Sequence, residues 1–163
     1  MTDRNFGLNG NTKVDAYLEF RNARQAGLGM PLPAGRIRVS KLDAADGSLE
    51  FVGEDRIDHT PKDEQVRVRL GSAFDVVGER RQVDFTVDTR ARTMEEEFEI
   101  TVRNHKDEAV DVEVREPLIR AAGWTVLSSS QTYRKDDAHT ISFDTKTPKD
   151  GTTKVRYRVR YTW

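Results

Sequence analysis

The sequence contains no cysteine among its 163 residues. Disulfides, thiolate metal sites and cysteine nucleophiles are therefore excluded, while the compartment stays open because cytosolic and many envelope proteins both manage without cysteine. No apolar run approaches the roughly 20 residues that a membrane-spanning helix needs, so we expect no direct membrane insertion. A chain of this length can bury a hydrophobic core without covalent cross-links.

An excess of charge of one sign is also missing, because 27 Lys and Arg residues stand against 28 Asp and Glu residues. Nucleic-acid-binding domains usually carry a basic excess, so no nucleic-acid partner is expected. The glycine-rich segment 27–35 lacks the Gly-Lys-Ser/Thr ending of a phosphate-binding loop, and Ser128–Ser130 lack the glycines of a nucleophile elbow. The sequence therefore predicts a protein that is not an enzyme and has no cofactor.

Alternation of apolar and polar residues is the feature that the sequence does have. The final strand shows two alternating sets of four residues: Val155, Tyr157, Val159 and Tyr161 on one side, and Lys154, Arg156, Arg158 and Arg160 on the other. A period of two indicates an extended strand with one buried face. Further strand-like runs lie at 14–20, 36–39, 48–52, 66–70, 83–88, 98–103, 110–115, 124–127 and 140–143.

These runs predict an all-β protein, an antiparallel immunoglobulin-like β-sandwich preceded by a β-rich segment. The dipeptide Asp46-Gly47 predicts a hairpin turn, and the polar stretch 104–108 predicts a second hairpin between its flanking runs. A boundary near Gly71 to Gly78 divides the chain into a β-rich N-terminal segment, 1–75, which can share the same sheet system, and the sandwich, 76–163.

Histidine is scarce, and His59 is the one whose neighbours suggest chemistry. It stands near Asp58, Asp63 and Glu64, so a metal-binding or metal-dependent hydrolase site is conceivable there. The favoured interpretation is a capped turn, in which the Thr60 hydroxyl accepts a backbone N–H. His105 and His139 are expected in solvated turns.

The basic stripe of the final strand, Lys154, Arg156, Arg158 and Arg160, is a candidate interaction surface for a polyanion. An acidic stripe of the same period, Glu95, Glu97 and Glu99, offers the competing explanation. Opposite charges on neighbouring strands stabilise a sheet, and the chain as a whole is close to neutral. Pairing between the two stripes is therefore the favoured interpretation.

Several segments resemble a bacterial family, the domain of unknown function 4139, which includes proteins labelled mucoidy-inhibitor-like. The likeness runs from about residue 14 to the end, in segments 17–22, 27–35, 51–61, 71–80, 104–106, Trp124 and 159–161. The resemblance implies that this chain is the C-terminal part of a longer protein, often preceded by a signal peptide. It implies an extracytoplasmic parent, in the periplasm or on the cell surface, and it supplies no established catalytic residues to carry over to this chain.

The expected function is therefore a non-catalytic β-sandwich module of a bacterial extracytoplasmic protein, engaged in protein interaction or assembly. Its partner would be an unknown protein or the rest of the parent chain. Edge strands and the 27–35 loop are the expected contact surface, because a strand edge can accept the backbone of another chain. The metal site at His59 and polyanion binding by the final strand remain the alternatives.

Overall fold

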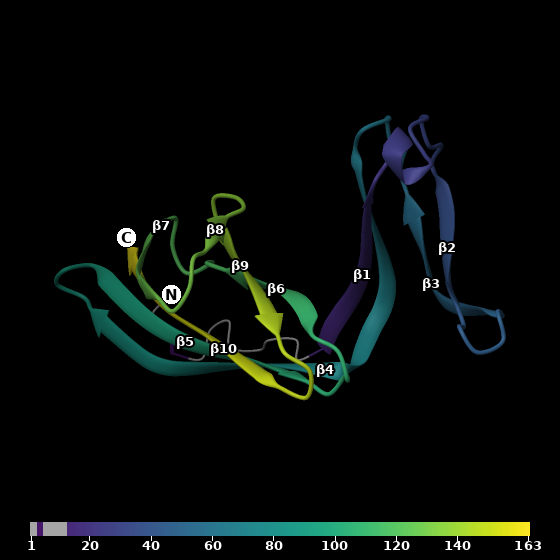
Figure 1. Ribbon diagram of the computed structural model, residues 1–163. Coiled ribbons are helices and arrows are strands. Elements are labelled where there is room, and N and C mark those ends of the chain that lie inside the picture. Colours follow the sequence, from purple (N-terminus) through teal and green to yellow (C-terminus); the bar gives the residue numbers. More distant parts are fainter. Residues whose placement is uncertain (1–2, 5–12) are drawn as a thin grey trace. The chain divides into compact units, whose positions relative to one another are not determined.

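The computed structural model describes residues 3–4 and 13–163, which form antiparallel strands and one short 3-10 helix. The all-β, sandwich-like class expected from the alternation is confirmed. The strands are β1 (Lys13–Arg21), β2 (Gly35–Leu42), β3 (Leu49–Ile57), β4 (Gln65–Asp88), β5 (Thr93–Asn104), β6 (Val110–Pro117), β7 (Gly123–Ser129), β8 (Arg134–Lys135), β9 (Thr140–Thr147) and β10 (Thr152–Thr162), and the helix is η1 (Arg24–Ala26) (Figure 1).

The chain forms two compact units. One comprises residues 15–73 and is called the hairpin unit below; the other comprises 1–14 with 74–163 and is called the sandwich unit. β4 contributes to both, because its first part pairs with β1 and its later part pairs with β5. The described residues contain no helix that is long and apolar enough to cross a membrane.

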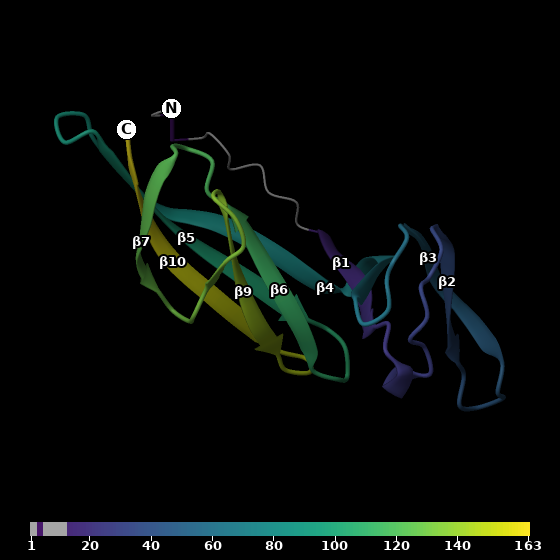
Figure 2. The same cartoon turned by 90° about the horizontal axis from the view of Figure 1, so that it is seen from above.

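The sandwich unit packs strands in the order β4-β5-β10-β7 against a second sheet, β6-β9-β8 (Figures 1 and 2). An aromatic stack joins the two sheets: the rings of Phe98 and Tyr157 are 5.6 Å apart, and Phe143 of β9 lies 5.6 Å from Tyr157. The alternation predicted for the final strand is confirmed, since Val155, Tyr157, Val159 and Tyr161 are all at most 2% exposed. Hydrophobic burial by alternate residues thus forms the core.

Two details differ from the sequence-based expectation. The runs at 66–70 and 83–88 belong to the single 24-residue strand β4, which continues without a break through the predicted boundary between residues 75 and 76. The stretch 104–108 is not a hairpin turn, because β5 and β6 lie in different sheets. Buried Asn104 holds this crossing by donating to the carbonyls of Glu108 (2.8 Å) and Pro148 (2.9 Å).

The hairpin unit has a smaller core, in which Val66 and Val68 of β4 are almost fully buried. β2 and β3 pair with each other as a separate two-stranded ribbon, as the Asp46-Gly47 signal predicts (Figures 1 and 2). The ribbon approaches β4 at Gly53, where a Cβ atom would lie 2.4 Å from the carbonyl oxygen of Leu70. Glycine is required at this crossing because no side chain fits between the two backbones.

Candidate interaction site

One fully buried side chain, Asn22, organises the loops at the end of the hairpin unit that follows β1. Its amide nitrogen donates to the carbonyls of Met30 (2.7 Å) and Pro61 (2.9 Å), and its amide oxygen accepts from the backbone N–H of Gly29 (3.0 Å). Asn22 therefore ties the 27–35 loop to the turn before β4. Burying an amide is favourable here because both of its polar atoms are hydrogen-bonded.

Backbone contacts close the same loop against the same turn. Leu32 and Thr60 exchange two hydrogen bonds, Leu32 N to Thr60 O at 2.8 Å and Thr60 N to Leu32 O at 2.9 Å. The N–H of Ala34 donates to Nδ1 of His59 at 3.3 Å. Two segments that are separate in the sequence, 27–35 and 58–64, thus form one hydrogen-bonded loop cluster.

The backbone of the loop requires glycine at Gly29, which has φ +97°. A side chain there would be strained in this left-handed conformation, and its Cβ would lie 2.7 Å from Cγ of Arg24. The short helix η1 turns the chain just before the loop and is followed by its C-cap Gly27, which has φ +75°. The loop conformation is therefore specified by residues of its own sequence as well as by Asn22.

Apolar side chains point away from this fixed backbone into solvent. Met30 is 67% exposed and Leu28 is 37% exposed. The same loop cluster has a hollow of about 350 Å³, lined by Ala23, Arg24, Gln25, Gly29, Lys62 and Asp63. The cluster thus combines an exposed methionine with a hollow, lined mainly by polar side chains, on a hydrogen-bonded frame.

The structure does not bring the candidate metal ligands together. Within the described residues, no three His, Asp or Glu side chains are grouped so that they could hold a metal ion. Nδ1 of His59 faces the Ala34 N–H, and the Asp63 carboxylate lies 3.9 Å from Nζ of Lys62. Glu64 contributes its backbone carbonyl, which accepts from the Asn22 N–H at 2.8 Å.

The hydrogen bonding predicted for Thr60 is wrong in direction. Its hydroxyl donates to the carbonyl of Asp58 at 2.9 Å and does not accept from a backbone N–H. The N–H of Asp63, three residues further along the turn, is instead bonded to the carbonyl of Asn22 at 2.8 Å. The two other histidines, His105 and His139, are exposed in connections between strands, as expected.

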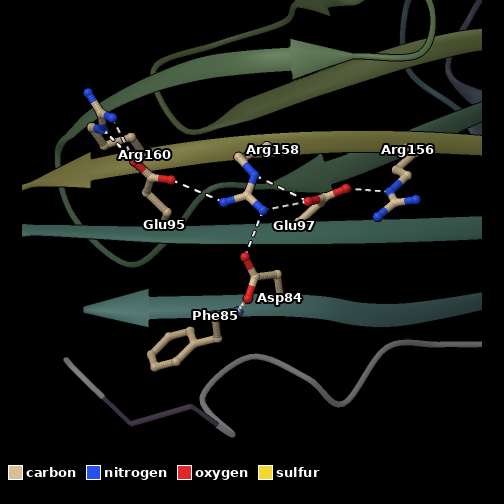
Figure 3. Close-up of polar contacts among 7 residues, drawn as sticks. All are labelled: Asp84, Phe85, Glu95, Glu97, Arg156, Arg158 and Arg160. Carbon is tan, nitrogen blue, oxygen red and sulfur yellow. Dashed lines mark hydrogen bonds and ion pairs between the residues drawn. The ribbon is translucent and has the colours of Figure 1, made fainter. Parts of the chain in front are cut away.

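The basic stripe on β10 is paired with acidic side chains of the neighbouring strands. Figure 3 shows Arg158 between three carboxylates, those of Glu97 (2.7 Å), Asp84 (2.7 Å) and Glu95 (3.1 Å). The remaining contacts are Lys154 to Glu99 at 3.3 Å, Arg160 to Glu95 at 2.6 Å, and Arg156 to Glu97. The pairing between the two stripes is thus confirmed.

These contacts change the acidity of the carboxylates. The hydrogen bond from Arg160 lowers the pKa of Glu95, and the bond from Arg158 lowers the pKa of Glu97. Arg158 likewise lowers the pKa of Asp84. Carboxylates that hold arginines in this way compete with any polyanion for the same guanidinium groups.

Sequence reasoning missed two buried carboxylates between the sheets. Glu96 accepts from Arg120 at 2.5 Å, and both side chains are 2% exposed. Glu116 is bonded to Arg80 at 2.8 Å and accepts from the hydroxyl of Tyr157 at 2.6 Å. Burial and the nearby Glu116 charge raise the pKa of Tyr157 well above its ordinary value. The available signal for Glu96 was its parity, which places it on the inward face of β5.

Comparison with known proteins adds no further information about this site. No family model, no curated protein and no solved structure matches the chain.

Proposed function

We propose that this chain is a non-catalytic β-sandwich module of a bacterial extracytoplasmic protein and that it serves protein interaction or assembly. The observation that carries the proposal is the loop cluster, in which the 27–35 loop is held by Asn22 while Met30 stays 67% exposed. The bacterial and extracytoplasmic parts of the proposal come from the family resemblance.

A loop that is ordered before it meets a partner binds at lower entropic cost than a mobile one. Asn22 supplies this order through its three side-chain hydrogen bonds, and the Leu32–Thr60 pair adds two more. Methionine suits the contact because its unbranched, polarisable side chain adapts to apolar surfaces. Binding residues commonly lie on loops that a rigid scaffold positions.

The alternatives have no comparable support from the geometry. At His59, as elsewhere in the described chain, no three His, Asp or Glu side chains are grouped so that they could hold a metal ion. Polyanion binding by Lys154, Arg156, Arg158 and Arg160 would have to displace the carboxylates that already hold these side chains. Both stay predictions, which metal analysis of His59→Ala and heparin retention at low salt can test.

Site-specific photo-crosslinking tests the interaction function. A photoreactive amino acid replaces Met30 in one sample and Lys149, an exposed residue of the sandwich unit, in the matched control. In bacterial envelope extract we expect one discrete product from position 30 that is absent from position 149. The product should be lost when Asn22→Ala is added, because the loop then loses its frame.

Equal crosslinking from both positions would contradict the proposal, as would a product that Asn22→Ala leaves unchanged. Two further variants separate surface chemistry from folding. Met30→Leu should retain competition for the partner, whereas Met30→Asp should lose it, and hydrogen exchange of β1 and β4 should be the same in both variants.

A further inference from the structure

β2 is an edge strand, and one of its two edges has backbone groups that another strand could pair with. It pairs with β3 along one edge over its whole length, and no strand of the described chain pairs with the other edge. The outer edge of β3 is partly occupied, since the carboxylate of Asp55 accepts from the N–H groups of Arg56 and Arg69, both at 2.8 Å. An open strand edge is a template for pairing with another chain.

One face of the ribbon is basic at its start. Arg36 and Arg38 both bind the single carboxylate of Glu54, at 2.9 and 3.0 Å, so one positive charge is left over. The side chain of Arg38 is 72% exposed. Lys41 adds a third cation to β2, which contains no acidic residue.

The same face becomes apolar towards the Asp46-Gly47 turn. A register shift after Val39 places Phe51 opposite Ser40 and Leu49 opposite Leu42. Successive even-numbered residues of β2 share a face, so Leu42 lies on the side of Arg36 and Arg38. Leu42, Leu49 and Phe51 are 62%, 71% and 64% exposed, which leaves a three-residue apolar patch in solvent.

From these features we propose that β2 accepts an extended acidic strand of a partner protein by edge pairing. An antiparallel partner strand would place an apolar side chain against Leu42. Its fourth and sixth residues after that one would be acidic, and their carboxylates would face Arg38 and Arg36. Backbone hydrogen bonds would supply affinity and the alternate side chains would supply specificity. The inference rests on the proposed interaction function and names the chemistry of a partner at a second surface.

The chain already contains this kind of pairing. The basic residues of β10 meet the acidic residues of β5 in an antiparallel register, with Arg158 opposite Glu97 and Arg160 opposite Glu95. A second copy of β2 offers no such match. Two copies paired along the whole strand would set Arg36 of each against Lys41 of the other, and like charges directly opposite destabilise a sheet.

Titration of the isotope-labelled full chain with a synthetic peptide tests the proposal. The probe is acetyl-Leu-Thr-Thr-Val-Glu-Thr-Glu-amide, and the control peptide has lysine at both glutamate positions. We expect amide shifts concentrated on residues 35–42, weaker at higher salt, and about tenfold weaker binding of the lysine peptide. That ratio corresponds to about 1.4 kcal/mol, the sum of two such charge pairs.

Matched variants assign the effect to the edge. The double variant Arg36→Glu/Arg38→Glu should reverse the preference between the peptides. The double variant Arg36→Gln/Arg38→Gln should abolish the preference and leave the amide resonances of β3 at their wild-type positions. Lys149→Glu makes a charge change of the same sign on the exposed surface of the sandwich unit and should leave the preference for the glutamate peptide. Two results would overturn the proposal: equal or absent binding of both peptides, or a dimer formed through β2. Loss of this binding with retained crosslinking at Met30 would refute only the strand-pairing inference.

Discussion

The two units of this chain bury apolar side chains to different extents. Among the described residues, the sandwich unit contains thirteen buried hydrophobic residues and five exposed large ones, while the hairpin unit contains three and eight. The difference follows from architecture, because two sheets facing each other bury one face of each, whereas a two-stranded ribbon leaves most of its surface in water.

The two units are also stabilised by different interactions. The sandwich unit is held by an interior in which Phe98, Phe143 and Tyr157 stack. The hairpin unit is held in large part by hydrogen bonds around Asn22 and presents apolar residues that its own fold does not use. Exposed apolar patches of this kind mark interaction surfaces in soluble proteins.

Truncating one phenylalanine in each unit tests this difference in apolar burial most directly. Phe143→Ala should lower the free energy of unfolding of the sandwich unit by about 3–5 kcal/mol, because a fully buried ring leaves a cavity. Phe51→Ala should change the stability by no more than about 0.5 kcal/mol, since the ring is 64% exposed. Chemical denaturation followed by near-ultraviolet circular dichroism measures both. A similar loss in the two variants would show that Phe51 belongs to a core.

Buried and exposed ion pairs should differ in the same way. Glu96→Gln removes the carboxylate that binds buried Arg120 and should cost about 3 kcal/mol, because a buried charge loses its ion-pair partner. Glu54→Gln in the hairpin unit should cost at most about 1 kcal/mol, since that carboxylate is 36% exposed. Urea denaturation compares the two variants. If Glu96→Gln is neutral, the pair does not contribute to the sandwich unit in the way its burial implies.

Each unit also contains a buried asparagine that fixes a connection, which allows the loops to be compared directly. Asn22→Ala should destabilise the 27–35 loop by about 2 kcal/mol, because three backbone groups lose their partner. Asn104→Ala should act likewise on the connections around Lys106 and Pro148. Amide hydrogen exchange should rise only in the unit that carries the substitution. Faster exchange in both units from either change would refute this separation.

The smallest expected effect is a pH dependence specific to the sandwich unit. The folded pKa values of Glu95 and Glu97 lie below the usual 4.5 because Arg160 and Arg158 bind the carboxylates. Their contribution is therefore fully present above about pH 4.5 and is lost as the pH falls through the lowered pKa. Arg158→Gln should reduce stability at neutral pH, and its difference from the wild type should shrink in acid.

Melting temperatures across this pH range, at low and high salt, measure the effect. Arg90→Gln, at an exposed turn, is the matched control and should show no such convergence. A constant difference between Arg158→Gln and the wild type down to low pH would mean that Arg158 acts through packing and not through charge.

Local pattern was sufficient for much of the fold. The alternation in β10 correctly predicted which four residues are buried, because the side-chain period of a strand is two in any sheet. The Asp46-Gly47 turn was predictable because its geometry depends on the residues within it. The opposite charges at matching periods likewise predicted the pairing of Arg158 with its glutamates.

The local pattern could not predict which strands and side chains that are distant in the sequence pair with each other. The stretch 104–108 has the length of a hairpin turn, but β6 pairs with β9 instead of β5, a choice made by sheet packing and by Asn104. The continuity of β4 through residues 71–78 was also missed, since pairing with β5 keeps Val76, Val77 and Gly78 in the strand. Asn22 appeared in the sequence only as one polar residue after a strand.

By itself, then, the sequence determined the class of the fold, the faces of its strands and the balance of its charges, because these depend on periods of two and on composition. Tertiary structure decided which strands share a sheet, that Glu96 and Arg120 meet inside the sandwich unit, and that Asn22 joins two loops into one cluster. Each of these depends on contacts between residues that are close in space and distant along the chain, and the period of a single strand carries no information about such contacts.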